Sequence, residues 1–183
     1  MLPAVTATAS VPDVVAGAVT ALADEQWRVA AALDSAQARG AWDARLRPEA
    51  RRRLVRLGHF PAYAAELDWT PREVAGHLRD SARIFAARIR RIRTEVEPVL
   101  ADFVTDALER LADYRATPPE SLVAELRTAQ AQLLQAVAAV RAGDLERPGV
   151  HEVDGRVTVA GLLAFLPEHQ RDHADQLRAL LQR

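Results

Sequence analysis

Long stretches of this sequence place apolar side chains three and four residues apart, and this spacing limits the possible folds more than any other feature. In residues 71–97 the repeat follows Thr70, Pro71 and Glu73, which form a capping box with proline at its favoured first helical position. The residues of the repeat are Val74, Leu78, Ser81, Phe85, Ile89, Ile92 and Val96. This period predicts an amphipathic helix that starts at residue 71 and is stopped or kinked at Pro98.

Three further long helices are predicted from the same kind of spacing. They cover residues 14–38, 119–142 and about 159–182, with Gly40 and Gly143 as stops for the first two and Thr158 as a possible N-cap for the last. Shorter helices are predicted over residues 48–57 and 99–114. A loop is predicted at Gly58 and Pro61, and a tight turn in "VDGRV" between short extended pieces. The fold class is therefore all-α, an antiparallel four-helix bundle with an extra short N-terminal or connecting helix. We expect a single domain over residues 1–183, with a core at about 65–183 plus the helix at 14–38.

Composition excludes several classes of function. The chain has 183 residues, a formal net charge of -1 and a pI near 6.5, so no bulk attraction to nucleic acid is expected. No apolar run reaches membrane-spanning length, and the N-terminus lacks the pattern of a signal peptide, so a cytoplasmic protein is expected. Because the chain has no cysteine, any catalytic thiol would have to come from outside the protein. The three tryptophans, Trp27, Trp42 and Trp69, are predicted to anchor the core.

Two histidines one helical turn apart stand on the inner face of the last predicted helix. On a helical wheel of about 100° per residue, Leu166 lies within the apolar stripe of this helix. His173 lies about 20° and His169 about 60° from Leu166, so both point inward or along the inner edge. Imidazoles with this spacing can bind one metal ion from the same side. His77 lies about 60° from Val74, at the edge of the stripe on the other well-marked helix. If these two helices are antiparallel neighbours, the three rings can reach one depth in the bundle.

Each of these residues also has a structural explanation. An inward histidine is commonly a core residue satisfied by a hydrogen bond. His59 and His151 lie in predicted loops and are expected to be exposed, although His151 could line the mouth of a pocket. Glu168 points about 100° away from its neighbour His169 and is a poor co-ligand. Asp80 and Asp172 could orient ligating rings or be ordinary solvated carboxylates, and the second reading is favoured.

The segments "DWTPREVAGHLRDSARIFAARI" and "VTVAGLLAFLPEHQRDHADQLRAL" resemble two helices of the DinB/YfiT-like superfamily. The resemblance covers about residues 65–183. It implies a four-helix bundle, frequent homodimers and a divalent metal ion, such as zinc or nickel, bound by His77, His169 and His173. The segment before Trp69 is longer than in a minimal member, and Pro167 interrupts the last helix just before the ligand pair, where it could widen a pocket or disturb the ligands.

The resemblance leaves the reaction open. Known members include thiol-dependent transferases and isomerases that use bacillithiol or mycothiol, and enzymes described as metal-dependent hydrolases. The leading hypothesis is therefore a divalent-metal-dependent enzyme acting on a small molecule, either a hydrolase or an S-transferase or isomerase that uses a low-molecular-weight thiol. The alternatives are a non-catalytic bundle that binds a ligand or partner and keeps a structural or vestigial metal, and a metal-free bundle. An enzyme needs a cavity that reaches the metal, whereas a structural site is closed by a fourth protein ligand.

Overall fold

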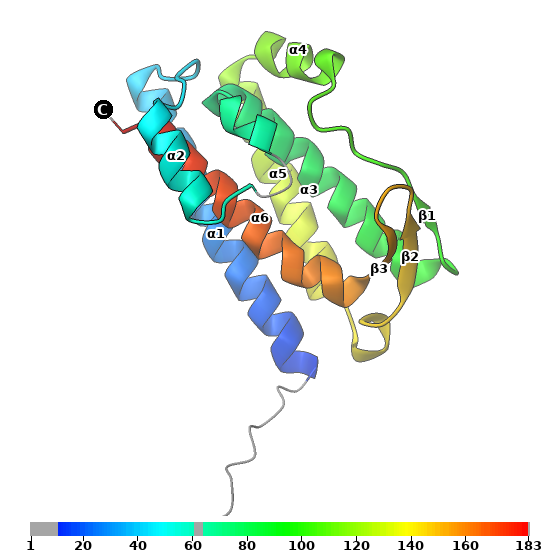
Figure 1. Ribbon diagram of the computed structural model, residues 1–183. Coiled ribbons are helices and arrows are strands. Elements are labelled where there is room, and N and C mark those ends of the chain that lie inside the picture. The colour runs from blue at the N-terminus through cyan, green and yellow to red at the C-terminus, as the bar shows by residue number, and fades with distance from the viewer. Residues whose placement is uncertain (1–10, 61–63, 183) are drawn as a thin grey trace, which may run out of the picture.

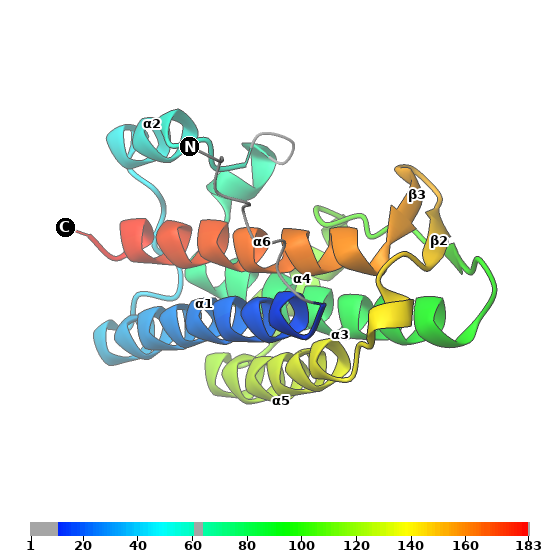
Figure 2. The same ribbon diagram turned by 90° about the horizontal axis from the view of Figure 1, so that it is seen from below.

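Four long helices surround one core in the computed structural model, which describes residues 11–60 and 64–182. They are α1 (Val11–Arg39), α3 (Pro71–Thr94), α5 (Pro119–Ala138) and α6 (Val159–Leu180). Helix α3 packs mainly against α5, and α1 packs mainly against α6. The pairs α1 with α5 and α3 with α6 close the ring, as Figures 1 and 2 show from two sides. The predicted four-helix bundle is confirmed.

The helix directions bring α3 and α6 together as antiparallel neighbours. Figure 1 shows α3 and α5 running one way, and α1 and α6 running the other. The side chains agree, because Arg39 near the end of α1 donates to the carbonyl of Leu181 just after α6, at 2.7 Å. In the first halves of α3 and α5, Arg79 donates to Glu125 at 3.3 Å. The assumption on which the convergence of the histidines depended therefore holds.

The ends of the long helices follow the capping signals in the sequence. The hydroxyl of Thr70 accepts from the backbone N–H of Glu73 at 3.3 Å, and the Glu73 carboxylate accepts from the backbone N–H of Thr70 at 2.7 Å. Thr158 caps α6 in the predicted way, with its hydroxyl accepting from the N–H of Gly161 at 3.2 Å. Gly40 ends α1 with a φ of 60°, a value that glycine adopts without strain. Helix α6 continues through Pro167 as one element.

The connections add short elements to the bundle. Helix α2 (Pro48–Arg56) and the 3₁₀ helix η1 (Ala64–Asp68) join α1 to α3, and α4 (Leu108–Ala116) precedes α5. The strands β1 (Val99–Leu100), β2 (Pro148–His151) and β3 (Gly155–Thr158) form a small sheet at the end of the bundle where α6 begins (Figures 1 and 2). Strand β1 pairs parallel with β2, and β2 pairs antiparallel with β3, so the predicted turn in "VDGRV" is a hairpin. A second 3₁₀ helix, η2 (Ala142–Asp144), follows α5.

Several sequence predictions need correction. Trp27 is 72% exposed on α1 and is not a core anchor, whereas Trp42 and Trp69 are buried as predicted. Helix α3 ends at Thr94, so Val96 lies beyond it and is 93% exposed. Helix α5 ends at Ala138, earlier than predicted, and residues 99–107 contain a strand and a loop before α4 begins. Gly58 lies in the predicted loop with a φ of 80°, and Pro61 falls outside the described residues.

Candidate metal centre

Three histidines from two helices meet in the interior, and they are the three that the sequence singled out. Each of His77, His169 and His173 offers one ring nitrogen, and these atoms all lie within 4.8 Å of one another. The Nε2 atoms of His77 and His169 are 3.0 Å apart. His77 comes from the second turn of α3, and the pair comes from successive turns of α6, which runs antiparallel beside it.

The surroundings of His77 and His169 favour the neutral form of both rings. Burial lowers the pKa of His77 well below its ordinary value, and the neighbouring His173, His169 and Arg110 lower it further. Burial and the nearby His173 act in the same direction on the pKa of His169. A neutral imidazole keeps a lone pair on one nitrogen, which is the form that binds a metal ion. These two rings are therefore ready for a cation.

Aromatic rings hold the three imidazoles in place. The indole of Trp69 lies parallel to the ring of His173 at 6.2 Å and contacts His77 at 4.9 Å, between ring centroids. The ring of Phe103 stacks on His77 at 5.7 Å, and that of Phe165 stacks on His169 at 5.3 Å. These contacts limit the rotation of the imidazoles and shield them from bulk water.

The donor set fits a divalent metal ion. Among the described residues, no hydrogen-bond partner faces Nε2 of His173, although this atom is buried, and the Nε2 atoms of His77 and His169 face each other. An unsatisfied buried polar atom is costly and uncommon, so the Nε2 atom of His173 indicates a missing ligand. In a tetrahedral zinc site with bonds of about 2.0–2.1 Å, ligand nitrogens lie about 3.3 Å apart, close to the separation of the His77 and His169 Nε2 atoms. These three histidines would hold such an ion.

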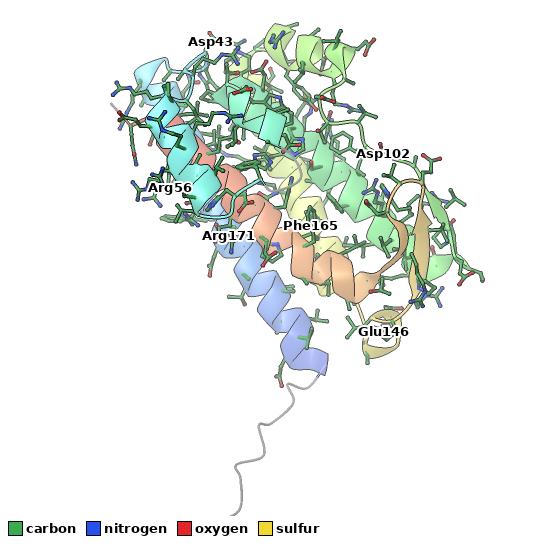
Figure 3. All side chains as sticks on the ribbon, in the orientation of Figure 1. Asp43, Arg56, Asp102, Glu146, Phe165 and Arg171 are labelled. Atoms are coloured by element: carbon green, nitrogen blue, oxygen red, sulfur yellow. The ribbon has the colours of Figure 1, made fainter. Side chains whose placement is uncertain are left out.

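A pocket of about 750 Å³ reaches the cluster from the end of the bundle that carries the sheet. His77, His169 and Glu66 lie in its inner wall. Its middle part is lined mainly by apolar and aromatic side chains, including Phe85, Leu100, Phe103, Leu162 and Phe165. The outer wall includes exposed residues of the β2–β3 hairpin and the loop after β1, where Asp102 is labelled in Figure 3. The histidines can therefore be reached by a small molecule.

His59 and His151 are both buried, with exposed fractions of 8% and 6%, so the prediction that they are exposed is wrong. The Nε2 atom of His59 lies 2.9 Å from the carboxylate of Asp175 on α6, which explains its burial. His151 ends β2 and lines the outer part of the pocket, where a guanidinium nitrogen of Arg88 lies 2.9 Å from its Nε2. The alternative that His151 contributes to the pocket therefore agrees with the structure.

The carboxylates that were considered as partners of the metal-ligating histidines make other contacts or are exposed. Asp80 accepts hydrogen bonds from Arg79, Arg110 and Tyr114 on the far side of α3, so it is neither a partner of His77 nor a solvated group. Asp172 accepts from the backbone N–H of Phe60 at 3.3 Å. Glu168 is exposed, in agreement with its exclusion as a co-ligand.

Sequence reasoning missed two polar residues beside the cluster. The side-chain oxygen Oε1 of Gln176 accepts a hydrogen bond from Nδ1 of His173 at 2.9 Å. Its position one turn after His173 is a signal that could have identified it, since residues three apart share a helix face. Glu66 lies with Oε2 at 3.4 Å from Nε2 of His173. No periodic pattern marks it, because it lies in a short 3₁₀ helix.

Comparisons with known proteins agree with the observed fold. The solved structure of YfiT from Bacillus subtilis, described as a probable metal-dependent hydrolase with an unusual four-helix bundle topology, superposes with a TM-score of 0.70. It is 19% identical in sequence, and the match covers 97% of this chain and 91% of that one. At this identity the likeness establishes the fold. The sequence matches none of the curated proteins with which it was compared.

Among the described residues, no helix is both long enough and apolar enough to cross a membrane.

The family of this chain follows from a sequence match that runs along nearly the whole chain. The model of the DinB superfamily matches residues 7–177, a range that includes α1, α3, all three histidines of the cluster and all but the end of α6. The chain therefore belongs to the DinB superfamily.

Proposed function

We propose that this protein is a divalent-metal-dependent enzyme, of the hydrolase type, that acts on a small molecule bound in the pocket beside His77 and His169. The observation that carries the proposal is the convergence of three histidine nitrogens within 4.8 Å at the inner end of an accessible pocket. The description of YfiT as a probable metal-dependent hydrolase supports the same class of reaction.

The residues of the chain have separate tasks in this proposal. His77, His169 and His173 would hold the ion, with zinc or nickel as the expected metals. A divalent ion bound by three imidazoles supplies Lewis acidity and activates water at neutral pH. The rings of Phe85, Phe103 and Phe165 would bind the apolar part of the substrate and exclude bulk water from the inner end of the pocket.

The open pocket distinguishes an enzyme from a protein with a structural metal site. A structural zinc site is enclosed by its protein ligands, whereas a catalytic site leaves the ion accessible to substrate. Here the pocket passes between α3 and α6 and includes His77 and His169 in its wall. This arrangement favours a catalytic role over a purely structural one.

The metal site can be tested on protein prepared without a histidine tag. We expect elemental analysis to find about one zinc or nickel ion per chain, and His173→Ala to lose stoichiometric metal. His59→Ala is the matched control, because His59 is buried against the same helix but lies outside the cluster. A parent protein free of metal after reconstitution, or a folded His173→Ala variant with a full complement, would refute the site.

The class of reaction requires a second experiment on the metal-loaded protein. Ester, amide and phosphoester substrates should be tested with and without an added low-molecular-weight thiol. The hydrolase proposal expects turnover without the thiol and its loss in His173→Ala. Turnover that strictly requires the thiol would instead show the S-transferase or isomerase chemistry, which an external thiol could supply to this cysteine-free chain.

A further inference from the structure

Glu66 places a buried carboxylate beside the histidine cluster without a matching positive charge. Its side chain is 4% exposed, and Oε2 lies 3.4 Å from Nε2 of His173. Among residues 11–60 and 64–182, the imidazole of His173 is the one basic side chain within ion-pair distance of Glu66. An isolated carboxylate loses much of its hydration on burial, so it needs a positively charged neighbour or hydrogen-bond donors.

The hydrogen bonds of Gln176 determine which nitrogen of His173 carries the proton. The amide nitrogen Nε2 of Gln176 donates to the backbone carbonyl of Glu66 at 2.5 Å. Its oxygen Oε1 must then be the atom that faces Nδ1 of His173, at 2.9 Å. An amide oxygen can only accept, so Nδ1 of His173 is the donor and bears the proton. In the neutral ring, Nε2 therefore presents a lone pair.

When the ring of His173 is neutral, this tautomer makes two hydrogen-bond acceptors face each other in the interior. The lone pair on Nε2 of His173 is directed toward a carboxylate oxygen of Glu66 at 3.4 Å, and no donor is placed between them. His77 and His169 add two more imidazoles to the same cluster. The arrangement is repulsive by itself and becomes attractive when a cation lies among these groups.

We propose that Glu66 is the anionic fourth member of the metal centre, its carboxylate facing the cation held by His77, His169 and His173. The inference rests on the proposed metal site and adds a residue that the family pattern of three histidines does not contain. Glu66 lies in the wall of the pocket together with His77 and His169. Its carboxylate is proposed as a charged neighbour of the ion and not as a fourth ligand, so the centre keeps the three-histidine set of an open site. One carboxylate reduces the net charge of a divalent centre and strengthens its hold on the ion.

Zinc affinity measured by competition with a chelator tests this role. We expect Glu66→Gln, which keeps the shape and removes the charge, to bind zinc at least tenfold more weakly than the parent. Asp68→Asn is the matched control, because it removes the same charge from the same 3₁₀ helix at a side chain that is 71% exposed and away from the cluster. Its zinc affinity should equal that of the parent. A folded Glu66→Gln variant within tenfold of the parent would overturn the proposal.

The melting temperature of the metal-free protein distinguishes the proposed role of Glu66 from a purely structural role of the same residue. The amide of Glu66→Gln can donate to the lone pair of His173, so the metal-free variant should melt no lower than the metal-free parent, while zinc raises its melting temperature less. A variant that melts lower without metal and responds to zinc like the parent contradicts the proposal. If Glu66→Gln does not fold, Glu66→Asp withdraws the carboxylate by one methylene, and a parent-like zinc affinity in that variant would also contradict it.

The experiment also separates this inference from the metal site on which it rests. If His173→Ala binds zinc with the affinity of the parent, the site itself is wrong and the inference about Glu66 falls with it. If His173→Ala loses zinc and Glu66→Gln retains it, the three-histidine site stands and only the role of Glu66 is refuted.

Discussion

The two sides of α3 carry buried polar groups that differ in how fully they are hydrogen-bonded. On the side toward α4, the carboxylate of Asp80 accepts from Arg79 at 2.8 Å, from Arg110 at 3.0 Å and from the hydroxyl of Tyr114 at 2.9 Å. On the side toward α6, His77 meets two further imidazoles, and the cluster retains buried nitrogens without a partner among the described residues. One helix thus supports a carboxylate that accepts from three donors and an imidazole cluster with unpartnered nitrogens, less than one turn apart in sequence.

The difference teaches how to separate structural from functional polar groups in this protein. A buried network whose donors and acceptors all match stabilises the fold without any ligand. A cluster of imidazoles with unpartnered lone pairs gains its matching charge only when a cation binds. Removing a group from the first should therefore destabilise the protein, while removing one from the second should mainly impair metal binding.

Asp80→Asn should produce the largest loss of stability among the variants that test this comparison. The amide replaces an acceptor oxygen by a donor that faces Arg110 or Tyr114, and it removes the charge that compensates two guanidinium groups. We expect the free energy of unfolding to fall by about 2–3 kcal/mol, since the side chain of Asp80 is mostly buried. Urea unfolding of the chelator-treated protein measures this effect.

The control for Asp80→Asn is Asp43→Asn, which alters an exposed ion pair. The Asp43 carboxylate is 81% exposed and lies 3.7 Å from Arg72. Exposed pairs of this kind contribute from about 0 to 1 kcal/mol, so this variant should be close to the parent. Equal losses in the two variants would show that the network around Asp80 has no special structural weight.

Glu73→Gln tests the same paired side of α3 at its first turn. Burial alone would raise the pKa of Glu73, but hydrogen bonds from Thr70 and Arg115 outweigh it and leave the pKa below its ordinary value. Glutamine keeps the capping geometry and removes the charge. We expect the free energy of unfolding at pH 7 to fall by about 1–2 kcal/mol, a loss typical of a hydrogen bond to a charged group.

The pH dependence of that loss provides its check. A lowered pKa in the folded state means that ionised Glu73 contributes its stability in full above the ordinary glutamate pKa of about 4.3. The contribution disappears as the pH falls through the lower folded pKa. The difference between Glu73→Gln and the parent should therefore be present at pH 7 and shrink below about pH 4. A difference that does not change with pH would assign the loss to packing.

Much of the fold could be predicted because its signals are local. The capping box at Thr70, the cap at Thr158 and the long apolar stripes each depend on neighbouring residues, and the structure reproduces them. The exposed position of Trp27 could not be predicted in this way. The sequence shows only that this residue is hydrophobic. Its burial depends on which face of α1 meets α5 and α6, and the packing of distant segments decides that.

The histidine cluster was found from sequence because its members lie on strongly periodic helices whose inner faces can be identified. Glu66 and the burial of His59 were not found, since both lie in irregular connections that have no periodicity. The position of Glu66 depends on the path of the chain from α2 to α3 and on Gln176, which holds its carbonyl. Such contacts join residues that are far apart in sequence, and no local pattern records them.

The smallest effect is expected for His169→Gln measured without metal. His169 is partly buried, its pKa is lowered and its Nδ1 has no partner among the described residues, so in the metal-free protein it contributes ring packing and the single hydrogen bond between its Nε2 and that of His77. We expect the free energy of unfolding to change by less than about 1 kcal/mol, well below the loss in Asp80→Asn. The same variant should lose most of the stabilisation that zinc gives the parent, because a ligand that binds only the folded state stabilises it in proportion to the logarithm of its affinity. A large loss of stability in the metal-free variant would place His169 with Asp80 among the structural groups and remove the distinction between the two sides of α3.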